Sequence, residues 1–160
     1  MRKIIIWSVL GTLCISSIRC LKSSTLTPCT NRTVSQDELG ILTYLAANNI
    51  TNYVKHSSGL YYKIDSVGGG ATANSSSKVY VKYTGKFTDN TVFDTVTDPS
   101  KTGFVLGTLI QGWQIGIPLI QKGGKIELFI PSALAYGCQQ VGPVPPNSIL
   151  VFTVELVDVI

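Results

Sequence analysis

Residues 78–87 of the chain, KVYVKYTGKF, are the stretch that decides the fold. Apolar and polar side chains alternate along it with a period of two, which is typical of a strand with one buried face. The residues that share one face are Val79, Val81 and Tyr83, and those on the other are Tyr80 and Lys82. The stretch therefore predicts a strand, and the residues at 88–90, TDN, predict the turn that ends it.

Further strands and one helix are predicted downstream and upstream of this stretch. The strands are expected at 60–64, 104–106, 125–130 and 149–157. Helical spacing links Ile110, Trp113, Ile117 and Ile120, with the glycines at 123–124 as a stop. Pro118 falls inside that run, so we expect the helix to be short or distorted. Mostly antiparallel strands around one central helix predict an α+β domain.

An N-terminal helix is predicted at about 36–48. Ser35 is its expected cap, with Glu38 three residues later as in a capping box. Its apolar positions at helical spacing are Leu39, Leu42, Leu45 and Ala46. We expect this helix to dock on the main domain, and a role in dimerisation is disfavoured because the helix is short.

Residues 1–20 have the order of an export signal, with Arg2 and Lys3 before an apolar stretch too short to span a bilayer comfortably. Cys20 stands where bacterial lipoproteins carry an acylated cysteine, although Arg19 occupies a position that calls for a small residue. Two interpretations remain: a lipid anchor on Cys20, or cleavage near 16–17 and a soluble exported product. We expect a tether and short helix at 21–56 and the main domain at 57–160.

The cysteines and charges exclude two kinds of site. The four cysteines are Cys14, Cys20, Cys29 and Cys138, and none lies at metal-ligand spacing from another or near His56. If Cys20 carries lipid, Cys29 can pair with Cys138 or remain free, and if it does not, Cys20 and Cys29 can close a short local loop. Three of the 13 basic residues lie in the leader, which leaves 10 against 9 acidic residues and no basic run with interleaved aromatics. We therefore expect no metal and no nucleic-acid partner.

Familiar catalytic motifs are missing from the sequence. It has no Gly-x-Ser-x-Gly elbow and no His-Glu-x-x-His, and His56 has no plausible nucleophile beside it. A reaction that needs neither nucleophile nor cofactor is then the remaining enzymatic option. Rotation about an X-Pro peptide bond is such a reaction.

An ordered set of short motifs over residues 75–160 resembles the FKBP family of prolyl isomerases. The motifs are VKYTG at 81–85, VFD at 92–94, FVL at 104–106, IQGW at 110–113, GG at 123–124, IPSALAYG at 130–137, PPN at 145–147 and LVFTVEL at 150–156. The resemblance implies an antiparallel sheet half-wrapped around the helix at 110–120, with a shallow apolar pocket between them. It also implies isomerase activity without a cofactor, on proline-containing segments of exported proteins in the periplasm or at a membrane surface, and binding of macrolide inhibitors.

The resemblance assigns pocket residues as well. They are Tyr83, Phe93, Asp94, Leu109, Ile110, Trp113, Tyr136, Val144 and Phe152. It implies that Trp113 forms the floor, that the Ile110 backbone N–H and the Tyr136 hydroxyl donate to substrate carbonyls, and that Asp94 accepts from Tyr83. Phe104, Leu128 and Leu156 are assigned to the core.

Two loops beside the expected pocket depart from the family pattern, which leaves rival functions open. The loop at 95–103 has no arginine or aromatic residue before Phe104 where some members add one to the pocket wall, and the segment at 138–144 is short and carries Cys138. The rivals are a catalytically weak module or chaperone that binds proline-containing peptides, and a scaffold assembled through the N-terminal helix.

Overall fold

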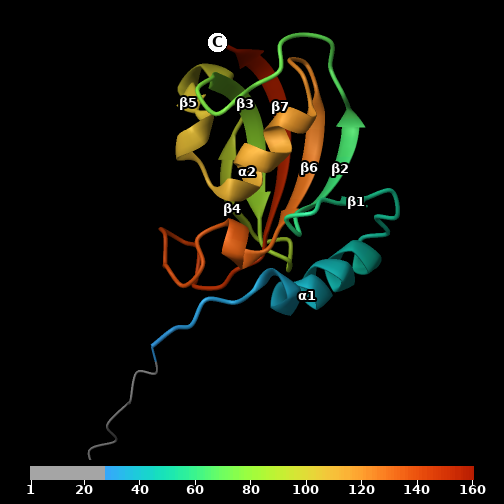
Figure 1. Ribbon diagram of the computed structural model, residues 1–160, viewed down its shortest axis with the longest axis vertical. Coiled ribbons are helices and arrows are strands. Elements are labelled where there is room, and N and C mark those ends of the chain that lie inside the picture. Colours follow the sequence, from blue (N-terminus) through green and yellow to red (C-terminus); the bar gives the residue numbers. More distant parts are fainter. Residues whose placement is uncertain (1–27) are drawn as a thin grey trace, which may run out of the picture.

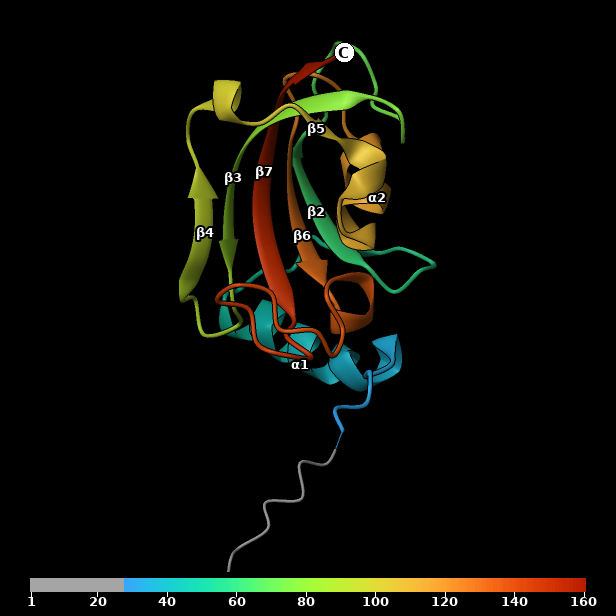
Figure 2. The same ribbon diagram turned by 90° about the vertical axis from the view of Figure 1, so that its left-hand side faces the viewer.

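The computed structural model describes residues 28–160, which contain one antiparallel sheet curved around a short helix, α2 (Gln111–Gly116) (Figures 1 and 2). Its strands are β1 (Val54–Lys55), β2 (Tyr61–Ser66), β3 (Lys78–Lys86), β4 (Val92–Val96), β5 (Phe104–Val105), β6 (Lys125–Ile130) and β7 (Leu150–Val159). The spatial order is β1-β2-β6-β7-β3-β4, and β5 pairs with the beginning of β3. The α+β fold expected from the sequence is confirmed.

The central strand β7 separates two apolar layers, because successive side chains of a strand point to opposite faces. It pairs with β6 on one side and with β3 on the other. The side chains that it contributes to the core beneath α2 are Leu150, Phe152, Val154 and Leu156, and Val79 and Val81 of β3 join them fully buried. Val151 belongs to a second cluster, with Tyr61 and Phe129.

Helix α2 is short, as expected from Pro118. The α-helix ends at Gly116 and continues as a single 3-10 turn, Ile117–Leu119. A proline lacks the backbone N–H that an α-helix interior needs, so the helix cannot run on through it. The helix also lies very close to β6: a Cβ on Gly112 would stand 2.5 Å from the side chain of Ile130, so this position has room only for glycine.

The N-terminal helix α1 (Val34–Ala47) begins earlier than the sequence suggested, and the expected cap at Ser35 is wrong. Thr33 is the N-cap: its hydroxyl accepts from the Gln36 N–H at 3.3 Å, and its own N–H donates to the Gln36 side chain at 2.8 Å. Both Thr33 and Ser35 fit the capping-box pattern. The Glu38 carboxylate is engaged elsewhere, since it accepts from Lys55 and from the Tyr61 hydroxyl.

Helix α1 packs across one end of the sheet (Figure 2). Its buried side chains Ile41, Tyr44 and Leu45 complete the second apolar cluster on Tyr61, Phe129 and Val151. Leu39, which the helical spacing placed on the apolar face, is instead 75% exposed. None of the helices in the described part of the chain is long and apolar enough to cross a membrane.

The segment before α1 is attached to the domain. Cys29 forms a disulfide with Cys138, with their Cα atoms 5.6 Å apart, so residues 28–33, expected as the end of a tether, are held against the loop that follows β6. The sheet begins at β1, ahead of the boundary expected at 57. The predicted signal peptide and the candidate lipidation site Cys20 lie outside the described residues.

Candidate active site

A hollow of about 210 Å³ lies between α2 and the strands β3, β4 and β7. Apolar and aromatic side chains make up most of its wall, which is usual for a site that binds an organic ligand. The residues that line it are Tyr83, Phe93, Asp94, Phe104, Thr108, Leu109, Ile110, Trp113, Tyr136 and Phe152.

The Trp113 indole lies on the inner side of this hollow and is only 4% exposed. Its ring meets the Tyr83 and Phe152 rings nearly edge to face, with centroids 5.2 Å away in each case and interplanar angles of 84° and 87°. Such pairs are the preferred geometry of aromatic quadrupoles. The indole Nε1 is buried without a hydrogen-bond partner among the described residues. Among the described residues, packing is therefore what holds the ring.

The sheet supplies the second aromatic wall. The ring of Phe93 of β4 meets the ring of Phe152 of β7 edge to face, with centroids 5.5 Å apart. The ring of Phe87 packs against Phe93, with centroids 4.9 Å apart. Gly85 lies between the two strands at this point, and a Cβ there would stand 2.7 Å from the rings of both Phe93 and Phe152. The glycine thus lets the rings close over the backbone of β3.

Tyr83 and Asp94 form the polar edge of the hollow. They lie on the neighbouring strands β3 and β4, and the Tyr83 hydroxyl donates to Asp94 Oδ2 at 2.6 Å. Burial raises the pKa of Tyr83 far above its usual value, and the hydrogen bond and charge of Asp94 raise it further. The Tyr83 phenol therefore stays protonated, and Asp94 keeps a fixed donor.

Two further donors belong to residues that line the hollow, Ile110 and Tyr136. Ile110 is the N-cap residue of α2, and its N–H makes no backbone hydrogen bond within residues 28–160. The Tyr136 hydroxyl likewise has no hydrogen-bond partner in this part of the chain. Burial raises the pKa of Tyr136, and the Asp94 charge adds to the effect. Both groups are thus able to donate to a bound molecule.

The sequence and the fold have counterparts among known proteins. The family model for FKBP-type peptidyl-prolyl cis-trans isomerase matches residues 69–157, more than half of the chain. The chain belongs to that family.

Two curated relatives of this FKBP-type chain are longer than the chain itself. The isomerase FkpA of Aeromonas hydrophila is 42% identical over 118 residues, which are 72% of this chain and 44% of the relative. The outer membrane protein MIP of Legionella longbeachae is 41% identical over 104 residues, 64% of this chain and 45% of that protein. The chain thus aligns with less than half of these curated relatives.

Solved structures agree on the fold of the FKBP-type domain. The crystal structure of FkpA from Escherichia coli superposes with a TM-score of 0.67 at 37% identity, covering 79% of this chain and 60% of that one. A peptidyl-prolyl isomerase from Pseudomonas syringae pv. tomato superposes with a TM-score of 0.66 at 28% identity, covering 81% of this chain and 98% of its own.

The FKBP-type hollow brings together nearly all of the residues that the sequence assigned to it. Val144 is the exception: it is 3% exposed, belongs to the core and does not line the hollow. Its backbone pairs with Val141 in a tight turn, which turns the side chain inward. The assignment of Val144 to the pocket therefore stays a prediction, because Val144 does not line the hollow itself.

Two lining residues were not assigned to the hollow from the sequence. Phe104, the first residue of β5, was assigned to the core, but it is only half-buried and borders the hollow. Its place in the motif FVL was the available signal. Thr108 borders the hollow from the 3-10 turn Leu106–Thr108, and nothing in the sequence pattern marked it.

Proposed function

We propose that this chain is a peptidyl-prolyl cis–trans isomerase that accelerates rotation about X-Pro bonds. The observation that carries the proposal is an aromatic hollow floored by Trp113 with two unengaged donors, the Ile110 N–H and the Tyr136 hydroxyl, at its border. An apolar ring such as proline fits the floor, and carbonyls on either side of it can accept from the donors.

The proposed mechanism rests on the polarity of the amide. Rotation about a peptide bond has a barrier of about 18–20 kcal/mol, which reflects the resonance that a twisted amide loses. A planar amide is more polar than a twisted one, so an apolar pocket with little water favours the twisted state relative to the planar state. The rings of Trp113, Phe93 and Phe152 supply such surroundings.

The polar groups orient the substrate in this mechanism. The Ile110 N–H and the Tyr136 hydroxyl donate to substrate carbonyls on either side of the prolyl bond. Asp94 accepts from the Tyr83 hydroxyl, and this hydrogen bond holds both side chains in place at the polar edge of the hollow. Leu109 contributes apolar surface to the same wall. No proton is transferred, and no cofactor or metal takes part.

We further propose that the substrates are proline-containing segments of exported proteins. The disulfide Cys29–Cys138 supports this location, because disulfides persist in oxidising compartments. The leader at 1–20 fits export, and one relative is named an outer membrane protein. A lipid on Cys20 would hold the enzyme at a membrane surface facing the periplasm or cell exterior. One acyl chain gives only marginal anchoring, so stable attachment needs more than one acyl chain on or beside that cysteine. Macrolide inhibitors are proposed to compete for the hollow.

The test is a protease-free assay of cis–trans exchange in a short proline peptide, followed by NMR. Acceleration over the spontaneous rate, lost in Trp113→Ala and retained in the exposed control Asn52→Ala, is the expected result. Peptide binding without any acceleration would replace the enzyme with a weak binding module or chaperone. Mass spectrometry of the mature N-terminus tests lipidation, since an unmodified Cys20 or its removal would exclude the anchor.

A further inference from the structure

The Tyr136 hydroxyl lies on a turn that is fixed from one side by the N-terminal helix. Ser132, just before the turn, donates from both its N–H and its hydroxyl to Asp37 Oδ2 of α1, at 2.8 and 2.5 Å. Asp37 is 1% exposed and also pairs with Arg32 at 3.3 Å. Ser132 in turn accepts from the Gly137 N–H at 2.9 Å, which closes the turn around Tyr136.

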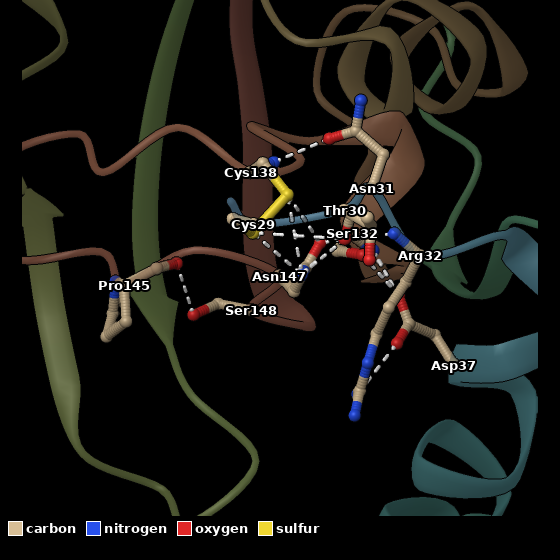
Figure 3. Close-up of a disulfide and its surroundings, with 10 residues drawn as sticks. All are labelled: Cys29, Thr30, Asn31, Arg32, Asp37, Ser132, Cys138, Pro145, Asn147 and Ser148. Carbon is tan, nitrogen blue, oxygen red and sulfur yellow. Dashed lines mark hydrogen bonds and ion pairs between the residues drawn. A yellow bond between two sulfur atoms is a disulfide. The ribbon is translucent and has the colours of Figure 1, made fainter. Parts of the chain in front are cut away.

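The other side of the same turn is fixed by residues 29–32 (Figure 3). Cys138 forms the disulfide with Cys29, and its backbone N–H donates to Asn31 Oδ1 at 2.7 Å. Asn31 lies so close that a Cβ on Gly137 would stand 2.6 Å from this oxygen. Gly137 also has a φ of +55°, which favours glycine.

Asn147 joins the two chain segments at the end of the loop. Its side-chain Nδ2 donates to the Thr30 carbonyl at 3.0 Å, and its Oδ1 accepts from the Arg32 N–H at 3.2 Å. Its backbone N–H donates to the Gly137 carbonyl at 2.6 Å. Figure 3 shows its side chain between the disulfide and the segment that leads to α1.

All these contacts hold backbone on both sides of Tyr136, while its hydroxyl has no partner within residues 28–160. The Tyr136 ring packs against the core, and without a hydrogen bond at its hydroxyl the place of that group depends on this packing and on the backbone that carries the ring. Ser132 and Asn147, which also hold this backbone, lie within the stretch 69–157 that the family model matches, whereas their partners at 30–37 and Cys29 lie outside it. Part of what holds the turn is therefore supplied by a segment that the family domain does not include.

We propose that residues 29–37 form a clamp that positions the Tyr136 hydroxyl, with Cys29, Asn31 and Asp37 as positioning residues. The proposal rests on the isomerase function proposed above, because the clamp would hold the Tyr136 hydroxyl in place to donate to the substrate carbonyl. The clamp acts through Tyr136 and touches no substrate itself. Loss of the clamp should therefore lower the isomerase rate by no more than loss of the Tyr136 hydroxyl does.

The kinetic test uses Asn31, an exposed residue that gives the clamp one hydrogen bond. In the whole chain, purified after export so that the disulfide forms, Asn31→Ala should lower kcat/KM by about two- to tenfold, the worth of one hydrogen bond. Asn31→Asp keeps the accepting oxygen and should restore the rate, and the matched exposed control is Asn52→Ala. In a Tyr136→Phe background, Asn31→Ala should have no further effect. An equal fall in both backgrounds, or no fall at all, overturns the clamp.

A second measurement does not depend on activity. With ring-labelled tyrosine, the NMR signal that disappears in Tyr136→Phe reports the ring of Tyr136 directly. That signal should shift or broaden in Asn31→Ala and in the double variant Cys29→Ser/Cys138→Ser, and stay in place in Asn52→Ala. A signal that does not move in either variant overturns the clamp. Absence of isomerase activity in the unmodified chain would instead refute the proposed function alone.

Discussion

The buried indole of Trp113 allows a sharp prediction about stability. Its Nε1 is buried without a partner among the described residues, while the ring contacts Tyr83 and Phe152 edge to face. An unpaired buried donor costs about 1–3 kcal/mol. Trp113→Phe removes that donor, keeps an aromatic ring against both neighbours and loses roughly two buried carbon groups, worth about 1.6 kcal/mol.

The two effects nearly cancel, so Trp113→Phe should change the free energy of unfolding by less than about 1 kcal/mol. Trp113→Ala has no such compensation and should cost about 3–5 kcal/mol. Urea denaturation followed by far-UV circular dichroism measures both variants without relying on tryptophan fluorescence. Comparison of the m-values checks that each variant still unfolds in one step.

A large loss in Trp113→Phe would refute this reasoning. If that variant lost about 3 kcal/mol or more, as expected for the alanine variant, the indole N–H would have to be satisfied in the native protein. An ordered water is one group that could satisfy it. Trp113 would then contribute a hydrogen bond through its indole N–H as well as an apolar surface at the floor of the hollow.

Four further predictions concern the disulfide and the tyrosines of the polar rim. The disulfide joins residues 109 positions apart and so restricts the unfolded chain, and Cys29→Ser/Cys138→Ser should lose about 3–5 kcal/mol of unfolding free energy, measured with urea. A loss below about 1 kcal/mol would contradict this chain-entropy argument. Burial and then the interaction with Asp94 raise the pKa of Tyr83, so Asp94→Asn should lower that pKa in a spectrophotometric titration; an unchanged value would mean that burial acts alone. The isomerase rate should be flat from about pH 6 to about 9, because burial raises the pKa of both Tyr83 and Tyr136 above their usual value near 10. Above about pH 10 tyrosines of the unfolded chain ionise first, so stability should fall as the pH rises, and a rise in stability there would contradict the assigned shifts.

Local sequence patterns were sufficient for the elements that surround the hollow. The alternation at 78–87 predicted β3 and its buried face, and the strand at 125–130 was predicted with the bounds that β6 has. Pro118 predicted the early end of α2. These features depend on the period of a strand or helix and on the chemistry of one residue, and both are written in a few neighbouring positions.

The sequence also identified most of the hollow, but only through the order of its motifs. Single aromatic residues in strands are usually core residues, and periodicity alone could not separate Phe152 at the hollow from Leu156 beneath it. For this reason Phe104 was assigned to the core although it borders the hollow, and Val144 was assigned to the pocket although its side chain is buried. Whether an apolar side chain ends in the core or at a border depends on the turn that carries it, and the turn at 141–144 directs Val144 inward.

Only the tertiary structure decided how the N-terminal segment meets the site. Two capping-box patterns compete at the start of α1, one beginning at Thr33 and one at Ser35. Thr33 is the N-cap, and the Glu38 carboxylate that a cap at Ser35 would need accepts hydrogen bonds from Lys55 and Tyr61 instead. The pairing of Cys29 with Cys138 and of Asp37 with Ser132 joins residues that are 109 and 95 positions apart. Such contacts form because α1 packs across the end of the folded sheet, and no local pattern encodes where that end will lie.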